Sequence, residues 1–186
     1  MSEKISVIET ERLLLNGWTL SDEDIDGLYA YAKNPNVGPN AGWKPHASRE
    51  ESREIIETLF LPHKVWSIRE KATGKVVGSI GLEPDRRRED VNSMEVGYSL
   101  AEECWGKGYM TEACRAVIDY AFREFGLVVL SICTGPDNVR SQRVIEKCGF
   151  VYEGRQRKGY HIFDGTDRDN LVYSIIREEW EDERRG

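Results

Sequence analysis

The stretch CWGKGYMTEA, residues 104–113, opens a helix whose first turn has no capping side chain. Apolar residues recur at three- and four-residue spacing as far as Phe125, which predicts an amphipathic helix. Such a helix usually begins at Ser, Thr, Asp or Asn, whose side chain accepts a hydrogen bond from a free backbone N–H. Here Gly106, Lys107 and Gly108 stand at the start. Free amides, glycines that allow close approach and a lysine charge together predict an anion site, with a phosphate or pyrophosphate as ligand.

Two glycines before a helix are a weak signal by themselves. The spacing lacks the GxxxxGK[ST] pattern of Walker-type nucleotide loops, and it also lacks GxGxxG. The alternative interpretation is a tight turn whose amides bind water. Two neighbours favour the anion, because Thr111 adds a hydroxyl donor and no acidic side chain precedes Glu112 in the first turn. The rest of the chain must decide between the two interpretations.

Upstream, Glu95 is a single charge inside the apolar segment MEVGYSL, residues 94–100. Burying an unpaired carboxylate is costly, so this side chain faces either water or a site. In a regular strand, alternation places Glu95, Gly97 and Ser99 on one face and the apolar residues on the other, whereas a bulge would change the assignment. A solvent-facing position and a position in a site both stay open.

The elements around these residues follow from hydrophobic periodicity and turn residues. Residues 34–46 carry three prolines and two glycines and are expected to form a long loop, and residues 83–93 a polar connection between strands. The order of elements, β-α-α-β-β-β-α-β-α-β-β, predicts an α/β (α+β) fold with a central mixed sheet flanked by helices. We expect strands at 12–15, 65–70, 76–82, 94–100, 128–134, 151–158 and 169–176, and helices that begin at Ser21, at Ser48, near 108 and at Asn138.

Composition indicates a cytoplasmic protein with a single domain over residues 1–186. The 26 basic and 33 acidic residues give a net charge of −7, which argues against nucleic acid or an anionic membrane as partner. No apolar run has the length of a membrane span, and the N-terminus lacks a signal-peptide core. We expect reduced thiols and no metal site, because metal-ligand spacing is lacking among Cys104, Cys114, Cys133, Cys148, His46, His63 and His161.

Two motifs stand in a specific order, WGKGYMTEA at 105–113 and NVRSQRVIEKCGF at 138–150. Together they resemble the GNAT acetyltransferase superfamily, in its RimJ/RimL-like branch of ribosomal-protein N-terminal acetyltransferases. The family's loop pattern Q/R-x-x-G-x-G/A lies on Trp105, Gly108 and Met110, so its first and last positions depart from the strict form. The segments TERLLL, GWKPHAS and RDNLVYSI are similar too, and the resemblance covers nearly the whole chain.

The resemblance implies the GNAT acyl-CoA N-acyltransferase fold, with a splayed sheet, and acetyl-CoA as cosubstrate. In this family the strand before the loop separates from its neighbour, and the pantetheine arm pairs with its main chain. The pyrophosphate then lies on the amides of the loop. Asn138 caps its helix and also reaches the pantetheine. The implied cofactor-binding residues are Tyr98, Ser99, Leu100, Gly106, Lys107, Gly108, Tyr109, Met110, Thr111, Asn138 and Ser141.

The implied chemistry is direct attack of a neutral amine on the thioester in a ternary complex. Because an ammonium group has no lone pair, a base or a chain of waters must remove its proton, and Glu95 is the candidate base. Ser141 lies near the CoA sulfur in this family and is the candidate donor to the departing thiolate. A covalent acyl-cysteine is not expected, since no cysteine has a histidine partner in a recognisable motif.

The acceptor is the open question. Trp43 and His46 lie in the loop that covers the acceptor side in this family, and packing of Trp43 against the sheet is the alternative interpretation. The acceptor is a primary amine, either a protein N-terminus such as that of a ribosomal protein or a small amine. The alternative function is a non-catalytic acyl-CoA-binding sensor, and a phosphate-binding module would make the second motif a coincidence. Only the resemblance to the family suggests a homodimer.

Overall fold

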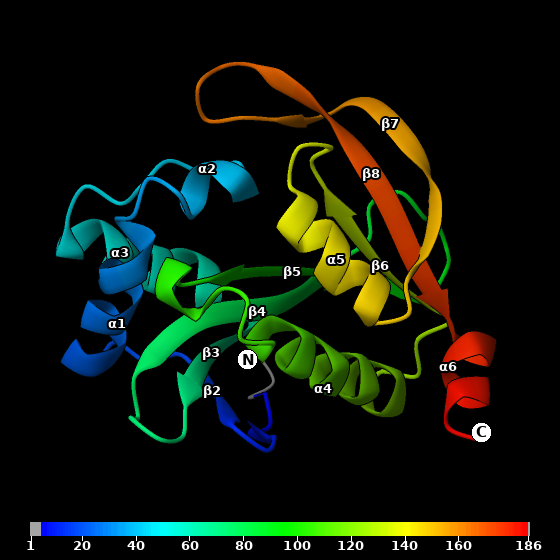
Figure 1. Cartoon of the computed structure of the whole chain (residues 1–186), viewed down its shortest axis with the longest axis horizontal. Coiled ribbons are helices and arrows are strands. Elements are labelled where there is room, and N and C mark those ends of the chain that lie inside the picture. Colours follow the sequence, from blue (N-terminus) through cyan, green and yellow to red (C-terminus); the bar gives the residue numbers. More distant parts are fainter. Residues whose placement is uncertain (1–4, 186) are drawn as a thin grey trace.

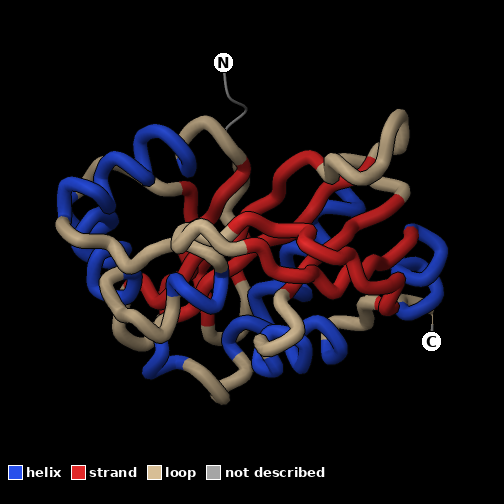
Figure 2. The backbone as a smooth tube through the Cα atoms, turned by 90° about the horizontal axis from the view of Figure 1, so that it is seen from above, coloured by secondary structure: helices blue, strands red, loops and turns tan. Residues whose placement is uncertain are grey.

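The computed structural model describes residues 5–185, and an eight-stranded mixed sheet runs through it in the order β1–β2–β3–β4–β5–β6–β8–β7 (Figure 1). Figure 2 shows helices on both sides of the sheet, so the expected fold class is confirmed. The strands are β1 (Ile8–Glu9), β2 (Leu13–Gly17), β3 (Lys64–Glu70), β4 (Val76–Pro84), β5 (Ser93–Leu100), β6 (Val129–Thr134), β7 (Val151–His161) and β8 (Asp167–Ile176). The helices are α1 (Asp22–Ala32), α2 (Gly38–Ala41), α3 (Arg49–Ile55), α4 (Tyr109–Glu124), α5 (Val139–Lys147) and α6 (Arg177–Glu183), with a π-helical turn η1 (Ile56–Phe60) and a 3-10 turn η2 (Glu102–Cys104).

The sheet divides between β5 and β6. These parallel strands are paired over three residues only, Ser93–Glu95 with Val129–Ser131. β5 nevertheless pairs with β4 as far as Leu100, and β6 pairs with β8 as far as Thr134. The two strands therefore separate after Glu95, and within the described residues the β6 side of 96–100 has no strand partner. The expected splay of the sheet is confirmed.

Helices α4 and α5 pack together on one face of the sheet, over β6, while α1 packs on β4 and α3 packs on α1. The apolar stripe of α4 is buried, and Leu130 and Ile132 of β6 contribute to the same core. The predicted end of α5 is confirmed: Gly149 is left-handed at φ 84°, and Phe150 N donates to Ile145 O at 3.3 Å. The two helices that follow the splayed strands are thus held against them.

Three elements were not expected from the sequence. The expected loop 34–46 contains the short helix α2, which ends at the left-handed Gly42, and β1 precedes the first expected strand. The charged C-terminus forms α6, where the Trp180 ring stacks on Phe122 of α4 with centroids 5.2 Å apart and its Nε1 donates to Asp119 at 2.8 Å. With one apolar residue in seven, α6 gives no periodic signal, so the formation of this helix depends on these tertiary contacts.

Candidate functional site

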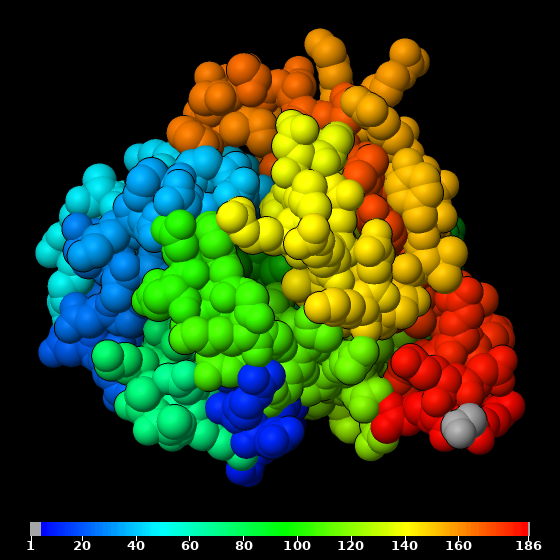
Figure 3. All heavy atoms as spheres, in the orientation of Figure 1, coloured from blue at the N-terminus to red at the C-terminus, as the bar shows by residue number. Residues whose placement is uncertain are grey.

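A cavity of about 380 Å³ lies where β5 and β6 separate. Figure 3 shows the hollow between the green surface that leads into α4 and the yellow surface of α5. Of the residues expected to bind the cofactor, all but Lys107 line this cavity. The lining comprises Val37, Asn40, Ala41, Tyr98, Ser99, Leu100, Cys104, Trp105, Gly106, Gly108, Tyr109, Met110, Thr111, Asn138, Arg140, Ser141, Arg143, Val144 and Lys147.

The loop before α4 has the conformation that the two glycines allow. Gly106 and Gly108 are left-handed, with φ of 77° and 81°, a region in which other residues are strained. Gly108 is the N-cap of α4, and no side chain caps the helix, as the sequence predicted. Trp105 Nε1 donates to Leu100 O at 2.9 Å and ties the loop to the end of β5. The amides of the first turn are therefore available at the wall of the cavity.

The one acidic side chain in this turn is directed away from the cavity. Glu112 accepts hydrogen bonds from Thr10 Oγ1 at 2.6 Å and from Arg12 N at 2.8 Å, and it forms a salt bridge with the Arg12 guanidinium. Arg12 Nη1 also donates to Lys107 O at 2.9 Å. Burial alone would raise the pKa of Glu112, but these bonds hold it below its usual value. Sequence reasoning missed Arg12, because its partner lies 100 residues away.

The opposite wall of the cavity is basic. Arg140, Arg143 and Lys147 of α5 line it, and Lys107 lies in the facing loop. The Arg140 guanidinium lies 4.4 Å from the centroid of the Trp105 ring, so it reaches across to that loop. Within residues 5–185 none of these four cations forms a salt bridge. Together with the free amides, they fit a ligand that carries several phosphates.

Two hydroxyl groups meet inside the cavity. Tyr98 Oη lies 3.0 Å from Ser141 Oγ, and the Ser141 amide donates to the Asn138 side chain at 3.2 Å, which is the predicted cap of α5. Ser141 is 9% exposed, and burial raises the pKa of Tyr98 above its usual value, so the phenol is neutral. Sequence reasoning assigned only the main chain of Tyr98 to the site. Strand alternation already indicated that its side chain points toward the helices.

The other face of β5 is open. β4 and β5 pair without a register shift, so Glu95, Gly97 and Ser99 share this face, and no bulge redirects Glu95. Gly97 is exposed, and a Cβ atom there would have no neighbour within 4 Å. Ser99 Oγ is bonded to Ser79 Oγ at 3.0 Å, so its hydroxyl belongs to the sheet rather than to the cavity. The β5 backbone is therefore exposed at Gly97, two residues from Glu95.

Glu95 is held by an arginine that sequence reasoning missed. Its Oε2 lies 3.0 Å from Arg87 Nη2 in the β4–β5 connection, and its side chain is 21% exposed. Burial and the neighbouring Glu95 raise the pKa of Cys133, on β6, to about 12. A thiol with so high a pKa is a poor nucleophile at neutral pH.

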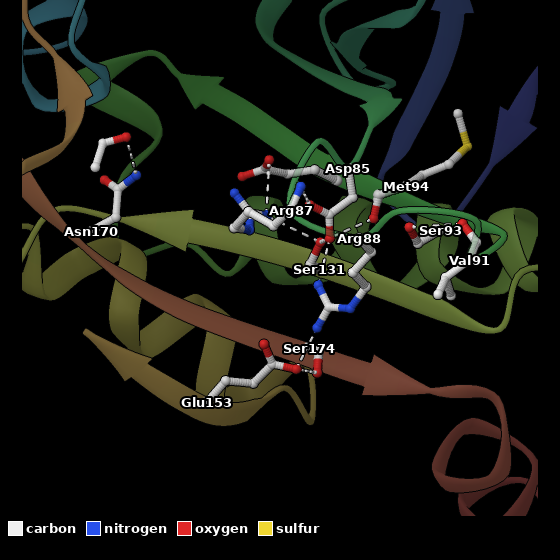
Figure 4. A network of polar contacts seen from close by, with 12 residues as sticks. Asp85, Arg87, Arg88, Val91, Ser93, Met94, Ser131, Glu153, Asn170 and Ser174 are labelled. Carbon is white, nitrogen blue, oxygen red and sulfur yellow. Dashed lines mark hydrogen bonds and ion pairs between the residues drawn. The ribbon is translucent and has the colours of Figure 1, made fainter. Parts of the chain in front are cut away.

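Figure 4 shows the network that positions Arg87. The Asp85 carboxylate is fully buried and accepts from Ser131 Oγ and Arg88 Nη1, each at 2.5 Å, and it lies 3.2 Å from Arg87 Nη2. Burial would raise the pKa of Asp85, but the bonds from Ser131 and the Arg87 amide hold it below its usual value. Arg88 continues the network to Glu153 on β7. The connection is thereby fixed on the sheet, next to Glu95.

Trp43 and His46 do not reach the cofactor cavity. They line a separate hollow of about 350 Å³ between the α2–α3 connection and the tip of the β7–β8 hairpin. Their rings lie 5.3 Å apart, and Trp43 also packs against the core, as the alternative interpretation stated. His46 Nδ1 lies 2.8 Å from Ser52 Oγ, and burial lowers the pKa of His46. Their role in acceptor binding stays a prediction.

Within residues 5–185, His, Cys, Asp and Glu side chains form no cluster that could hold a metal ion. Over the same residues, no helix has the length and apolar character needed to cross a bilayer.

Comparisons with known proteins agree with this geometry. The family model described as "Acetyltransferase (GNAT) domain" matches residues 12–151. An uncharacterised N-acetyltransferase of Bacillus subtilis, YoaA, is 29% identical over 176 residues, which are 92% of this chain and 97% of the relative. The [ribosomal protein uS5]-alanine N-acetyltransferase of Escherichia coli is 31% identical over 93 residues, 50% of this chain and 47% of that protein. The solved ribosomal-protein-S5-alanine acetyltransferase of Vibrio fischeri superimposes with a TM-score of 0.76 at 25% identity, covering 95% of this chain and 99% of that one.

Proposed function

The chain belongs to the GNAT acetyltransferase family, and from that premise we propose that it transfers the acetyl group of acetyl-CoA to a primary amine by direct attack in a ternary complex. One observation carries the proposal. The cavity at the separation of β5 and β6 joins a glycine loop with free amides to a basic wall and to a buried pair of hydroxyls. These three surfaces fit a long ligand that carries phosphates at one end and a thioester at the other.

The donor is proposed to bind with its phosphates at the α4 end of the cavity. The amides from Gly106 to Met110 hold the pyrophosphate, and Arg140, Arg143 and Lys147 interact with the remaining phosphate charge. The pantetheine arm lies in the gap beside Tyr98, Ser99 and Leu100, where the β6 side of the β5 backbone has no strand partner among residues 5–185. This arrangement brings the thioester toward the Tyr98–Ser141 pair.

The acceptor amine is proposed to approach from the opposite side, over Gly97. The ammonium proton is taken by Glu95, directly or through water, and the lone pair then attacks the thioester carbon. A backbone N–H between Val96 and Tyr98 stabilises the oxyanion of the tetrahedral intermediate. As the intermediate collapses, the C–S bond breaks and Ser141 donates its proton to the thiolate, while Tyr98, kept neutral by burial, orients Ser141. The proton that the attacking nitrogen loses as the amide forms passes through water to the Ser141 alkoxide and restores its hydroxyl.

Arg87 sets the conditions under which Glu95 works. Its guanidinium lies 3.0 Å from the Glu95 carboxylate and so fixes the position of that side chain. A shared water is proposed to carry the proton from the amine to the carboxylate in two short transfers. Within the RimJ/RimL-like branch, a protein N-terminus is the acceptor that the names of the relatives favour, since two of them act on a ribosomal protein by name.

Calorimetric titration with CoA, acetyl-CoA and ATP tests the proposal, followed by turnover with a panel of amines. We expect both CoA species to bind in the micromolar range or tighter and ATP to bind weakly, because ATP lacks the arm that fills the gap. An acceptor is then identified by acetylated product in mass spectra. Binding without turnover of any amine or N-terminal peptide would favour the non-catalytic acyl-CoA sensor, and absence of CoA binding would end the proposal.

A further inference from the structure

Arg168 is a partly buried cation in β8, and residues 5–185 offer it no carboxylate. Its Nη1 donates to Asn40 O at 3.0 Å, its guanidinium lies 4.9 Å from the centroid of the Tyr160 ring, and its Nε–H is buried without a partner. Burial lowers the pKa of Arg168, yet a guanidinium stays charged at neutral pH. On the same hairpin, the more exposed Arg155 pairs with Asp169 at 2.7 Å. The lack of a carboxylate partner is therefore a property of Arg168 and not of every arginine in the hairpin.

Arg168 lies next to the acyl end of the cofactor cavity. Its partner Asn40 lines that cavity and also accepts a bond from the Asn138 side chain at 3.4 Å. A Cβ atom on Gly135, just before α5, would lie 3.2 Å from Arg168 Nη1, so the guanidinium packs directly on this backbone. Helix α2, the β6–α5 connection and the hairpin therefore meet at this cation.

Arg168 and Glu95 also face the same strip of sheet. Ser131 is the register partner of Glu95, so Cys133, two residues further along β6, points to the same face. Cys133 is the register partner of Val172 on β8, so alternation along β8 places Arg168 on this face as well. The exposed Gly97 completes the strip. The Glu95 carboxylate and the Arg168 guanidinium thus lie at the two ends of this strip, and the point where β5 and β6 separate lies between them.

The hairpin fixes Arg168 in this position. β7 contains a bulge between Gln156 and Tyr160, beyond which the tip bends toward α2 (Figure 1). Tyr160 there packs against Gly42, and Phe163 N donates to Gly42 O at 3.3 Å. The ring of Tyr160 supports the guanidinium, so Arg168 is already ordered before a ligand binds. Binding a ligand there costs little conformational entropy of the protein.

We propose that Arg168 binds a carboxylate on the acceptor, so that the preferred acceptor is an amine that also carries a carboxylate group. The proposal rests on the acetyltransferase function: the amine lies over Gly97 near Glu95, and the carboxylate pairs with the guanidinium. The acceptor rather than the donor carries this group, because Arg168 does not line the cofactor cavity. Within residues 5–185 Arg168 Nη2 has no hydrogen-bond partner, and a guanidinium N–H of this kind is suited to a carboxylate.

The test uses bisubstrate conjugates, which require no turnover. The CoA sulfur is joined through –CH₂–C(O)– to the nitrogen of glycine, β-alanine or 4-aminobutyrate, and each conjugate is compared with its carboxamide. By calorimetry, we expect the wild-type protein to bind the carboxylate member of at least one pair about 10- to 100-fold more tightly. The Arg168→Gln variant should bind both members equally, and Arg168→Lys should keep part of the preference because it keeps the charge.

Arg155→Gln is the matched control, since it removes the same charge from the outer side of the hairpin and should keep the wild-type preference. Equal affinity within every pair of conjugates, or a preference that survives Arg168→Gln, would overturn this proposal. If the wild-type protein still binds CoA, the proposed acetyltransferase function is unaffected by that result. Loss of CoA binding by the wild-type protein would end both. Tighter binding of succinyl-CoA than of acetyl-CoA, abolished in Arg168→Gln, would place the carboxylate on the acyl group and contradict the assignment to the acceptor.

Discussion

Replacing Gly108 by Asp should weaken CoA binding through charge, because it places a carboxylate at the N-cap of α4 where the pyrophosphate is proposed to lie. With an effective dielectric constant of about 20 and a separation of roughly 5 Å, one carboxylate repels one phosphate charge by about 3 kcal/mol. Arg12 Nη2 would lie 3.4 Å from the new Cβ and would neutralise part of that charge. We therefore expect CoA to bind about 30- to 100-fold more weakly.

Gly108→Asn is the matched control, because asparagine has nearly the same shape, is neutral and tolerates the left-handed φ of 81° at this position. Both variants should lose about 1 kcal/mol of stability from backbone strain, which lowers the melting temperature by about 2–4 °C. Calorimetry of both variants isolates the charge, and their ratio of Kd should shrink as ionic strength rises from about 0.05 M to about 0.5 M. Equal Kd values in the two folded variants would show that no anion binds at these amides.

Four further substitutions test the chemistry and the hydrogen-bond network around Asp85. Ser141→Ala should lower kcat about 100-fold and Tyr98→Phe about 10-fold with the Kd of CoA unchanged, because both act on the leaving thiolate; equal loss of CoA binding would assign them to binding instead. Glu95→Gln should lower kcat/KM about 100-fold at neutral pH, whereas an unchanged kcat/KM would show that Glu95 takes no part in proton removal. Asp85→Asn should lower the free energy of unfolding by about 3 kcal/mol at pH 7 in urea titrations. The folded pKa of Asp85 lies below its ordinary 3.8, so the stability that its carboxylate contributes is present above that value and is lost as the pH falls through the folded pKa. The difference in unfolding free energy between variant and wild type should therefore vanish in strong acid. A difference that persists there would assign the loss to packing.

The parts of the fold that local sequence determines were predictable. The uncapped start of α4 and the stop of α5 depend on residues within a few positions, and both agree with the structure. The strand 94–100 could be predicted from its alternation, and the splay of the sheet from its family resemblance. A helix as short as α2, and one as poor in apolar residues as α6, carry too little periodic signal to be recognised.

Two of the arginines that sequence reasoning missed act through partners that are distant in the chain. Arg12 and Glu112 are 100 residues apart, and Arg168 reaches Asn40 across 128 residues. Neither pair leaves a pattern in one sequence, because any arginine can pair with any exposed carboxylate or carbonyl. The hydroxyl of Tyr98 is different: alternation placed it with the apolar residues, on the face opposite Glu95, but only the packing of α5 on the sheet showed that it meets Ser141.

The short pairing between β5 and β6 also bears on how stability is distributed. The β1–β5 and β6–β8 portions of the sheet are joined by backbone bonds over three residue pairs, so this junction is the place where local opening has the fewest bonds to break. A pantetheine arm in the gap would supply partners for amides of residues 96–100 and slow their hydrogen exchange. Because a ligand that binds only the folded state stabilises it by RT ln(1 + [L]/Kd), resistance of the protein to unfolding and proteolysis would follow the supply of acyl-CoA.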